Sequence, residues 1–133
     1  MSKQNVEIIR RAFEAYWAGD IEGVLGVCAE DIVITQDPDV PGVPPQQHGH
    51  DGVIEAFGLW PEQWDDFQIE ILRIVADPGD HVVVTTRQSG RGKESGVEVV
   101  GEFTFLFTVR DRKISEWRIF VQESQALDAL RQG

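Results

Sequence analysis

The sequence has very little cysteine and no long apolar run, and these shortages exclude several classes of protein. Its 133 residues include one cysteine, Cys28, so no disulfide can form within the chain. No stretch approaches the roughly 20 apolar residues that a membrane-spanning helix needs. The N-terminal segment carries Glu7, Arg10 and Arg11 where an export signal would have its apolar core. We therefore expect a cytoplasmic protein without a membrane span.

Basic residues are also scarce relative to acidic ones. There are 12 Lys and Arg against 23 Asp and Glu, which gives a net charge of −11. A chain of this charge repels nucleic-acid phosphates and anionic lipid headgroups, so neither is an expected partner. Hydrophobic residues make up 41% of the chain, an ordinary share for a globular protein. The length suits a single domain over residues 1–133.

Three segments of the first half have the apolar spacing of amphipathic helices. The first covers residues 5–17 and ends before Gly19. In the second, Asp20 is the expected N-cap of a helix that runs to about Ala29 and includes Cys28. The third begins near Asp51, and Pro61 is expected to break it before Trp64. The first two helices should form a short hairpin.

Strand patterns dominate the rest of the chain. The β-branched run at 32–35 predicts a short strand, which several prolines then end. Four further strands are expected at 67–76, 81–89, 97–109 and 113–123. Short turns join them, so they should form an antiparallel meander, and a short helix at 124–130 closes the chain. This order predicts an α+β fold with helices packed on one face of a curved sheet.

The expected strand at 97–109 gives the sheet two different faces. Phe103, Phe105 and Phe107 recur at every second position, so all three should point into the helix-covered interior. The opposite face still carries Leu106 and Phe120. Large apolar side chains on an uncovered face are typical of an oligomer interface, so we expect a homodimer.

Several short motifs, taken in their order, resemble a known family. They are Ala18-Gly19-Asp20, Ala29-Glu30-Asp31, Gly49-His50-Asp51, and Arg110-Asp111-Arg112-Lys113-Ile114 leading to Glu116-Trp117-Arg118. Together they resemble the SnoaL-like branch of the nuclear-transport-factor-2-like superfamily, over nearly the whole chain. The resemblance implies a cone-shaped, cystatin-like α+β fold that encloses an apolar pocket. It does not imply one reaction, because ketosteroid isomerases, limonene epoxide hydrolases and polyketide cyclases share this fold.

The residue sets of two of these reactions are not retained. At the position of the isomerase tyrosine the sequence has Ala12, and the buried acid of the isomerase falls among the sheet phenylalanines. The epoxide hydrolases are similar at Arg87, but their two water-activating aspartates fall on Ser89 and Ile119. We therefore expect neither mechanism.

The remaining candidate site is a pocket with a phenylalanine floor and a few polar groups. The candidate catalytic residues are Asp37, as general base, with Tyr16 and Arg87. The candidate ligand-binding residues share an expected place on the pocket wall: Gln36, Thr85, Ser89, Phe103, Phe105, Phe107, Trp117 and Trp60. Such a site suits a small, partly apolar ligand with one polar end.

Each polar candidate also has a structural interpretation. Arg87, if it points inward, meets Asp37 or a ligand carboxylate; otherwise it forms an ion pair within the protein or stays in water. Tyr16 either packs in the core or donates to a ligand, and Asp37 is either a base or a solvated turn residue. His48 and His50 have a metal-like spacing but lack accompanying ligands, so we expect neither a metal nor a cofactor.

Two functions follow from these residues. The first is a cofactor-independent isomerase, cyclase or dehydratase that acts on a small apolar or aromatic metabolite by acid–base chemistry. The second is a non-catalytic ligand-binding or interaction module. They differ in one feature, because the enzyme needs a titratable group with a shifted pKa at the cavity, whereas a binding module does not.

Overall fold

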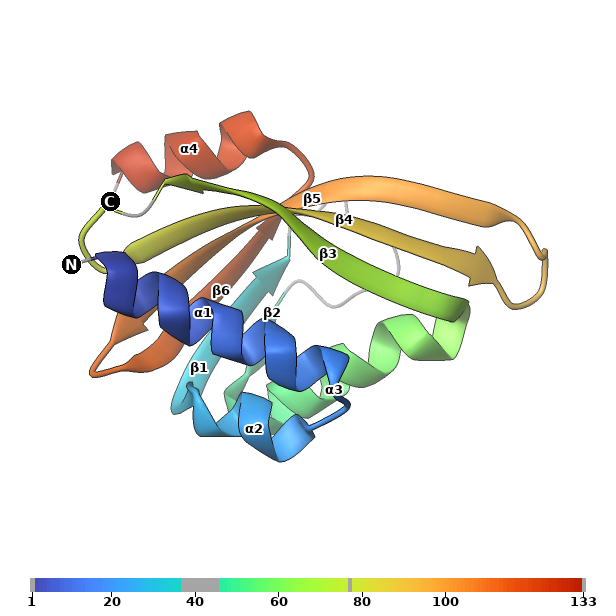
Figure 1. Cartoon of the computed structure of the whole chain (residues 1–133), viewed down its shortest axis with the longest axis horizontal. Helices are drawn as coiled ribbons and strands as arrows, with labels where there is room; N and C mark the ends of the chain where they lie inside the picture. The colour runs from blue at the N-terminus through green and yellow to red at the C-terminus, as the bar shows by residue number, and fades with distance from the viewer. Residues whose placement is uncertain (1, 37–45, 77, 133) are drawn as a thin grey trace.

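The fold is a curved six-stranded sheet with three helices on its concave face and one on its convex face (Figure 1). The computed structural model describes residues 2–36, 46–76 and 78–132, and it describes only the backbone of residues 2 and 57–63. The elements are α1 (Ser2–Trp17), α2 (Ile21–Gly26), β1 (Cys28–Gln36), β2 (Gln46–His48), α3 (Gly49–Gln63), β3 (Trp64–Ala76), β4 (His81–Gly92), β5 (Glu98–Arg110), β6 (Lys113–Phe120) and α4 (Glu123–Gln132). The predicted α+β fold is confirmed.

Local sequence signals fix the hairpin of α1 and α2. The stripe that includes Ile9 and Phe13 is buried against the sheet, as the helical spacing requires. Gly19, at φ +73°, provides the left-handed residue that ends α1. The Asp20 carboxylate then accepts a hydrogen bond from the Gly23 N–H at 3.0 Å and caps α2. Both turn signals were predicted from the sequence.

The predicted end of the second helix was wrong. α2 stops at Gly26, and Cys28 begins strand β1 instead of lying within a helix. The reason is tertiary, because β1 pairs in parallel with β6, with Cys28 opposite Ile114. Ladder hydrogen bonds to a strand distant in sequence outweigh the weak helix preference of this segment.

The sheet order is β2-β1-β6-β5-β4-β3. Strands β3 to β6 form the predicted antiparallel meander, and the parallel contact with β6 adds β1 to it. The short strand β2 was not predicted. The expected break at Pro61 was also wrong, since α3 is continuous to Gln63. Pro61 lies in the last helical turn, where its missing N–H affects the end of the helix and not its middle.

Helix α4 covers the convex face of the sheet (Figure 1). Leu106 is only 2% exposed and packs with Val83 and Ala126, and Phe120 packs against this cluster. Leu106 and Phe120 do lie on the outer face, as predicted, but α4 covers them, so the exposure from which a dimer was inferred was wrong. The chain's own C-terminal helix covers this part of the face. The homodimer stays a prediction, but an exposed apolar face at these two residues no longer supports it.

A cluster of hydrogen bonds at Glu123 connects the start of α4 to the sheet. One oxygen of the Glu123 carboxylate accepts hydrogen bonds from the Thr85 hydroxyl at 2.8 Å and from Arg73 Nε and Nη2 at 3.1 and 2.9 Å. The Thr85 hydroxyl also lies 2.9 Å from that of Thr104 on β5. The hydrogen bond from Thr85, followed by that from Arg73, lowers the pKa of Glu123. The carboxylate is thus stabilised in its charged form.

This cluster predicts a pH dependence of stability. Because the folded pKa of Glu123 is lowered, its contribution is complete above the ordinary pKa of 4.5 and is lost as the pH falls through the folded value. We expect Glu123→Gln to lower the urea midpoint at pH 7, and the difference from wild type to shrink towards pH 3. The exposed Asp128→Asn, on the same helix, is the control and should leave the midpoint nearly unchanged. A constant difference from pH 7 to pH 3 would contradict this account.

Candidate functional site

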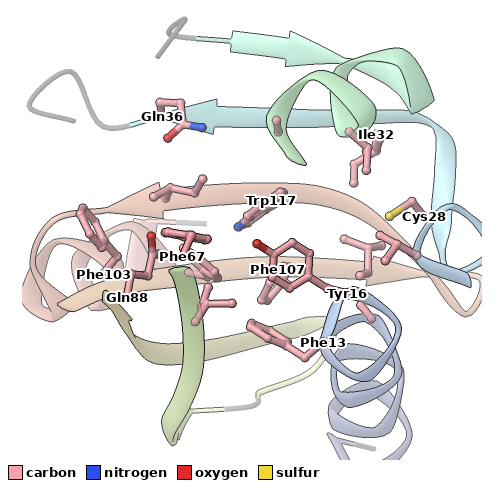
Figure 2. Close-up of a pocket in the computed structure, with 18 residues that line it drawn as sticks. Phe13, Tyr16, Cys28, Ile32, Gln36, Phe67, Gln88, Phe103, Phe107 and Trp117 are labelled. Carbon is pink, nitrogen blue, oxygen red and sulfur yellow. The ribbon is translucent and has the colours of Figure 1, made fainter. Parts of the chain in front are cut away.

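An apolar pocket lies between the concave face of the sheet and the helices α1, α2 and α3 (Figure 2). The space between its walls is about 900 Å³, including the part that opens to solvent. Seven of the eighteen lining residues are aromatic: Phe13, Tyr16, Phe67, Phe103, Phe105, Phe107 and Trp117. Phe105 contacts Trp117 edge-on, with ring centroids 5.3 Å apart, and Phe107 stacks on Trp117 at 6.1 Å. These rings support one another and form a rigid floor.

Six of the predicted site residues line this pocket as expected. They are Tyr16 from α1, Gln36 from β1, Phe103, Phe105 and Phe107 from β5, and Trp117 from β6. Two others, Asp37 and the side chain of Trp60, lie outside the described residues. The placement of the six is established by the structure, whereas their roles in binding or catalysis stay predictions.

The three candidates on β4 were assigned to the wrong face of the sheet. In an antiparallel pair, directly opposed residues point to the same side. The inward phenylalanines Phe105 and Phe103 are opposite Val84 and Thr86, so continuing the alternation along β4 points Gln88 inward. The three predicted residues, Thr85, Arg87 and Ser89, alternate with these and point to the convex side.

The contacts of Arg87 confirm its outward position. Its side chain is 49% exposed, and its Nη1 lies 3.5 Å from Glu70 Oε1 on β3. Glu102 on β5 is directly opposite it in the ladder. Arg87 therefore forms a surface ion pair, the structural alternative given above, and does not contribute to the pocket wall. A pair this exposed contributes little to stability.

Thr85 and Ser89 are likewise separated from the pocket by the sheet. Thr85 is buried beneath α4 in the cluster with Glu123 and Thr104, and Ser89 lies on the same convex side. The three residues were assigned to the wrong face because residues 82–86 are buried on both faces, by the pocket-side core and by α4. The run has three valines followed by two threonines, so it contains no alternation of apolar and polar residues from which the inward face could be assigned.

Gln88 is the polar residue that the sequence analysis missed. It lines the pocket together with Gln36, and Figure 2 shows both amides at the same end of the pocket. Its inward position follows from the ladder between β4 and β5. From Phe103 to Phe107, every second residue of β5 is an inward phenylalanine, and the residues of β4 that pair with this series, or with its continuation, also point inward. This pairing was the signal that would have identified Gln88.

Two titratable groups line the pocket, and both are held in their protonated forms. Burial raises the pKa of the Tyr16 hydroxyl. Burial also raises the pKa of the Cys28 thiol to about 11, against a smaller opposing effect of Lys113. Among the described lining residues, none carries a carboxylate, an imidazole or a cation. The described wall therefore supplies hydrogen bonds and apolar contacts, and no general base at neutral pH.

The shifted thiol predicts slow chemistry at Cys28. At pH 8 the thiol lies about three pH units below its pKa, so about one thiol in a thousand is ionised. We expect iodoacetamide to alkylate the folded protein at least about 100-fold more slowly than the urea-unfolded protein, measured by mass spectrometry. Equal rates for the two states would show that Cys28 does not lie in the pocket wall.

Among the described residues, the histidines are not gathered with other potential metal ligands. His50 has its Nε2 at 3.0 Å from the carbonyl oxygen of Cys28, and His48 is exposed on β2. No three His, Cys, Asp or Glu side chains of the described residues gather at one point. Within the described ranges, no helix has both the length and the apolar character needed to cross a membrane.

Comparison with known proteins gives a consistent result. The family model of the SnoaL-like domain matches residues 9–117. An NTF2-like protein from Burkholderia xenovorans LB400 has 26% identity and a TM-score of 0.77, with 97% of each chain covered. A protein assigned as a SnoaL-like polyketide cyclase, from Jannaschia sp. CCS1, has 20% identity and a TM-score of 0.77, covering 99% of this chain and 94% of its own.

A third solved structure, of TerC co-crystallised with polyporic acid, has 21% identity and a TM-score of 0.78, with 98% and 99% of the two chains covered. The likeness to TerC and to the Jannaschia protein, at such low identity, shows a shared fold alone. No curated protein has a matching sequence.

Proposed function

Since the chain belongs to the SnoaL-like domain family, we propose that it binds a small, uncharged and largely aromatic metabolite in the pocket. The observation that carries this proposal is the composition of the wall. The described lining combines aromatic and aliphatic side chains with two neutral amides, Gln36 and Gln88. A pocket of this composition, mostly apolar with a few polar groups, is typical of sites that enclose a small organic ligand.

The charge of the ligand follows from the same wall. A charged group that leaves water needs a partner of opposite charge, and without one the transfer is costly. The one cation predicted for the site, Arg87, lies on the convex face and pairs with Glu70. A carboxylate ligand would therefore be poorly compensated, whereas an uncharged aromatic molecule would pack against the phenylalanines. TerC, with the same fold, was crystallised with an organic ligand, which is consistent with this use of the scaffold.

A matched pair of ligands tests the proposal. At pH 7 2-naphthol is uncharged, because a phenolic hydroxyl titrates near pH 10, whereas 2-naphthoate is ionised. We expect isothermal titration calorimetry to give 2-naphthol at least about tenfold higher affinity than 2-naphthoate. Equal or tighter binding of the carboxylate would contradict the proposal and would indicate a cation at the site.

Acid–base catalysis is the second candidate, favoured by the position of Tyr16. Its hydroxyl is on the pocket wall and stays protonated, so it is suited to donate to a developing oxyanion. A base would also be needed, and Asp37, the residue after Gln36, stays the predicted one. In that case the chain would be a cofactor-independent isomerase, cyclase or dehydratase. With any substrate that is turned over, Asp37→Asn should abolish turnover and preserve affinity; unchanged turnover would remove Asp37 from the mechanism.

A further inference from the structure

We propose that Gln36 selects ligands that carry a hydroxyl or N–H group, by accepting a hydrogen bond through its Oε1. This inference rests on the proposed function, because it specifies the polar end of the ligand bound in the same pocket. It adds a requirement that the apolar wall alone does not impose. An aromatic molecule of the right size but without a hydrogen-bond donor should bind less well.

The position of Gln36 places its amide at the pocket. Gln36 is the last residue of β1 and lies opposite Ile119 of β6, which also lines the pocket. Its side chain extends from β1 toward the pocket, at the same end as Gln88 (Figure 2). Apart from Cys28 and Gln88, the other sheet residues that line the pocket are Phe, Ile or Trp, so an amide at this position is unusual.

The hydrogen-bonding state of Gln36 indicates that its amide can bind a ligand. The residue is only 5% exposed, and its Oε1 accepts no hydrogen bond within the protein. A buried carbonyl oxygen normally has a partner, and leaving it without one is costly. The terminal amide torsion of glutamine is soft, so a small rotation can align Oε1 with a ligand in the pocket. A ligand donor would therefore satisfy a group that the protein leaves unsatisfied.

A second buried glutamine, Gln47, serves as an internal control for Gln36. Gln47 is also 5% exposed, and its Oε1 likewise has no partner. However, its Nε2 donates to Glu55 Oε1 at 2.9 Å, and Gln47 does not line the pocket. Gln47 therefore shares the burial of Gln36 but has no access to a ligand in the pocket. Substituting it controls for the effect of removing a buried amide as such.

The experiment compares 2-naphthol with 2-methoxynaphthalene, which has the same ring system but no donor. Affinities are measured by isothermal titration calorimetry at pH 7 for wild type, Gln36→Met and Gln47→Met. We expect wild type to bind 2-naphthol about tenfold more tightly than the ether, the usual effect of one buried hydrogen bond. Gln36→Met should reduce this ratio to near one, and Gln47→Met should keep it.

Each outcome separates this inference from the proposed function. Equal affinities in wild type, or a preference that persists in Gln36→Met, would overturn the role of Gln36 and leave the aromatic pocket intact. A persistent preference would mean either that another acceptor in the pocket, such as Gln88, takes the hydrogen bond or that the methyl group of the ether clashes with the wall. If neither compound binds wild type, the proposed function fails and this inference fails with it. Should Gln36→Met not fold, equal affinities of the two compounds for wild type would still overturn the inference.

Discussion

Phe105→Ala is expected to lower the free energy of unfolding by about 3–5 kcal/mol, the range for removing a buried phenylalanine. Phe105 is 3% exposed, and its ring contacts those of Phe13, Phe107 and Trp117 at centroid distances of 6.3, 5.8 and 5.3 Å. These three rings come from α1, β5 and β6, so the substitution weakens contacts between elements distant in sequence. Urea unfolding followed by tryptophan fluorescence measures the loss.

Phe103→Ala is the matched control for this substitution. Phe103 lies on the same face of β5, two residues away, but is only partly buried. We expect a loss of about 1–2 kcal/mol, because less surface leaves water on folding and a smaller cavity remains. Equal losses for the two substitutions would contradict the placement of Phe105 at the centre of the aromatic cluster.

Leu106→Ala is the second substitution with a large expected effect. We expect the free energy of unfolding to fall by about 2–5 kcal/mol, since Leu106 is 2% exposed beneath α4. The loss should not depend on protein concentration, because the covering helix belongs to the same chain. If a second chain covered this face instead, the unfolding midpoint would rise with protein concentration, and Leu106→Ala would weaken that dependence.

Val100→Ala is the control for the convex face. Val100 points to the same side of β5 as Leu106 but lies beyond α4 and is 57% exposed. An exposed substitution of this kind should change the free energy of unfolding by less than about 0.5 kcal/mol. Similar losses at the two positions would mean that α4 does not protect Leu106 in solution.

The elements of the fold were largely predictable because their signals are local. The helical stripe of α1, the Asp20 cap and the turns between the later strands each depend on a few neighbouring residues. The errors arose where distant contacts decide the structure. Cys28 joins a strand because β6 pairs with it, and Leu106 is buried because α4 returns across the sheet. Neither contact is encoded in the segment that it changes.

The same difference between local signals and distant contacts applies to the candidate site. The recurrence of an aromatic ring at every second position assigned Phe103, Phe105 and Phe107 to the interior, which the structure confirms. On β4 the run from Val82 to Thr86 is buried on both faces, so its inward side could not be assigned from the pattern of this strand alone. Arg87 was placed in the pocket for that reason, and Gln88 was missed.

Isoleucine methyl NMR tests the central claim, that the concave pocket is the binding site. On addition of 2-naphthol, ring currents should shift the methyl signals of the pocket residues Ile32, Ile69, Ile114 and Ile119. The signals of the exposed residues Ile21 and Ile54 should stay in place. This is the result that the account predicts. Shifts at Ile21 and Ile54, with the four pocket signals unchanged, would place the ligand on the surface and contradict it.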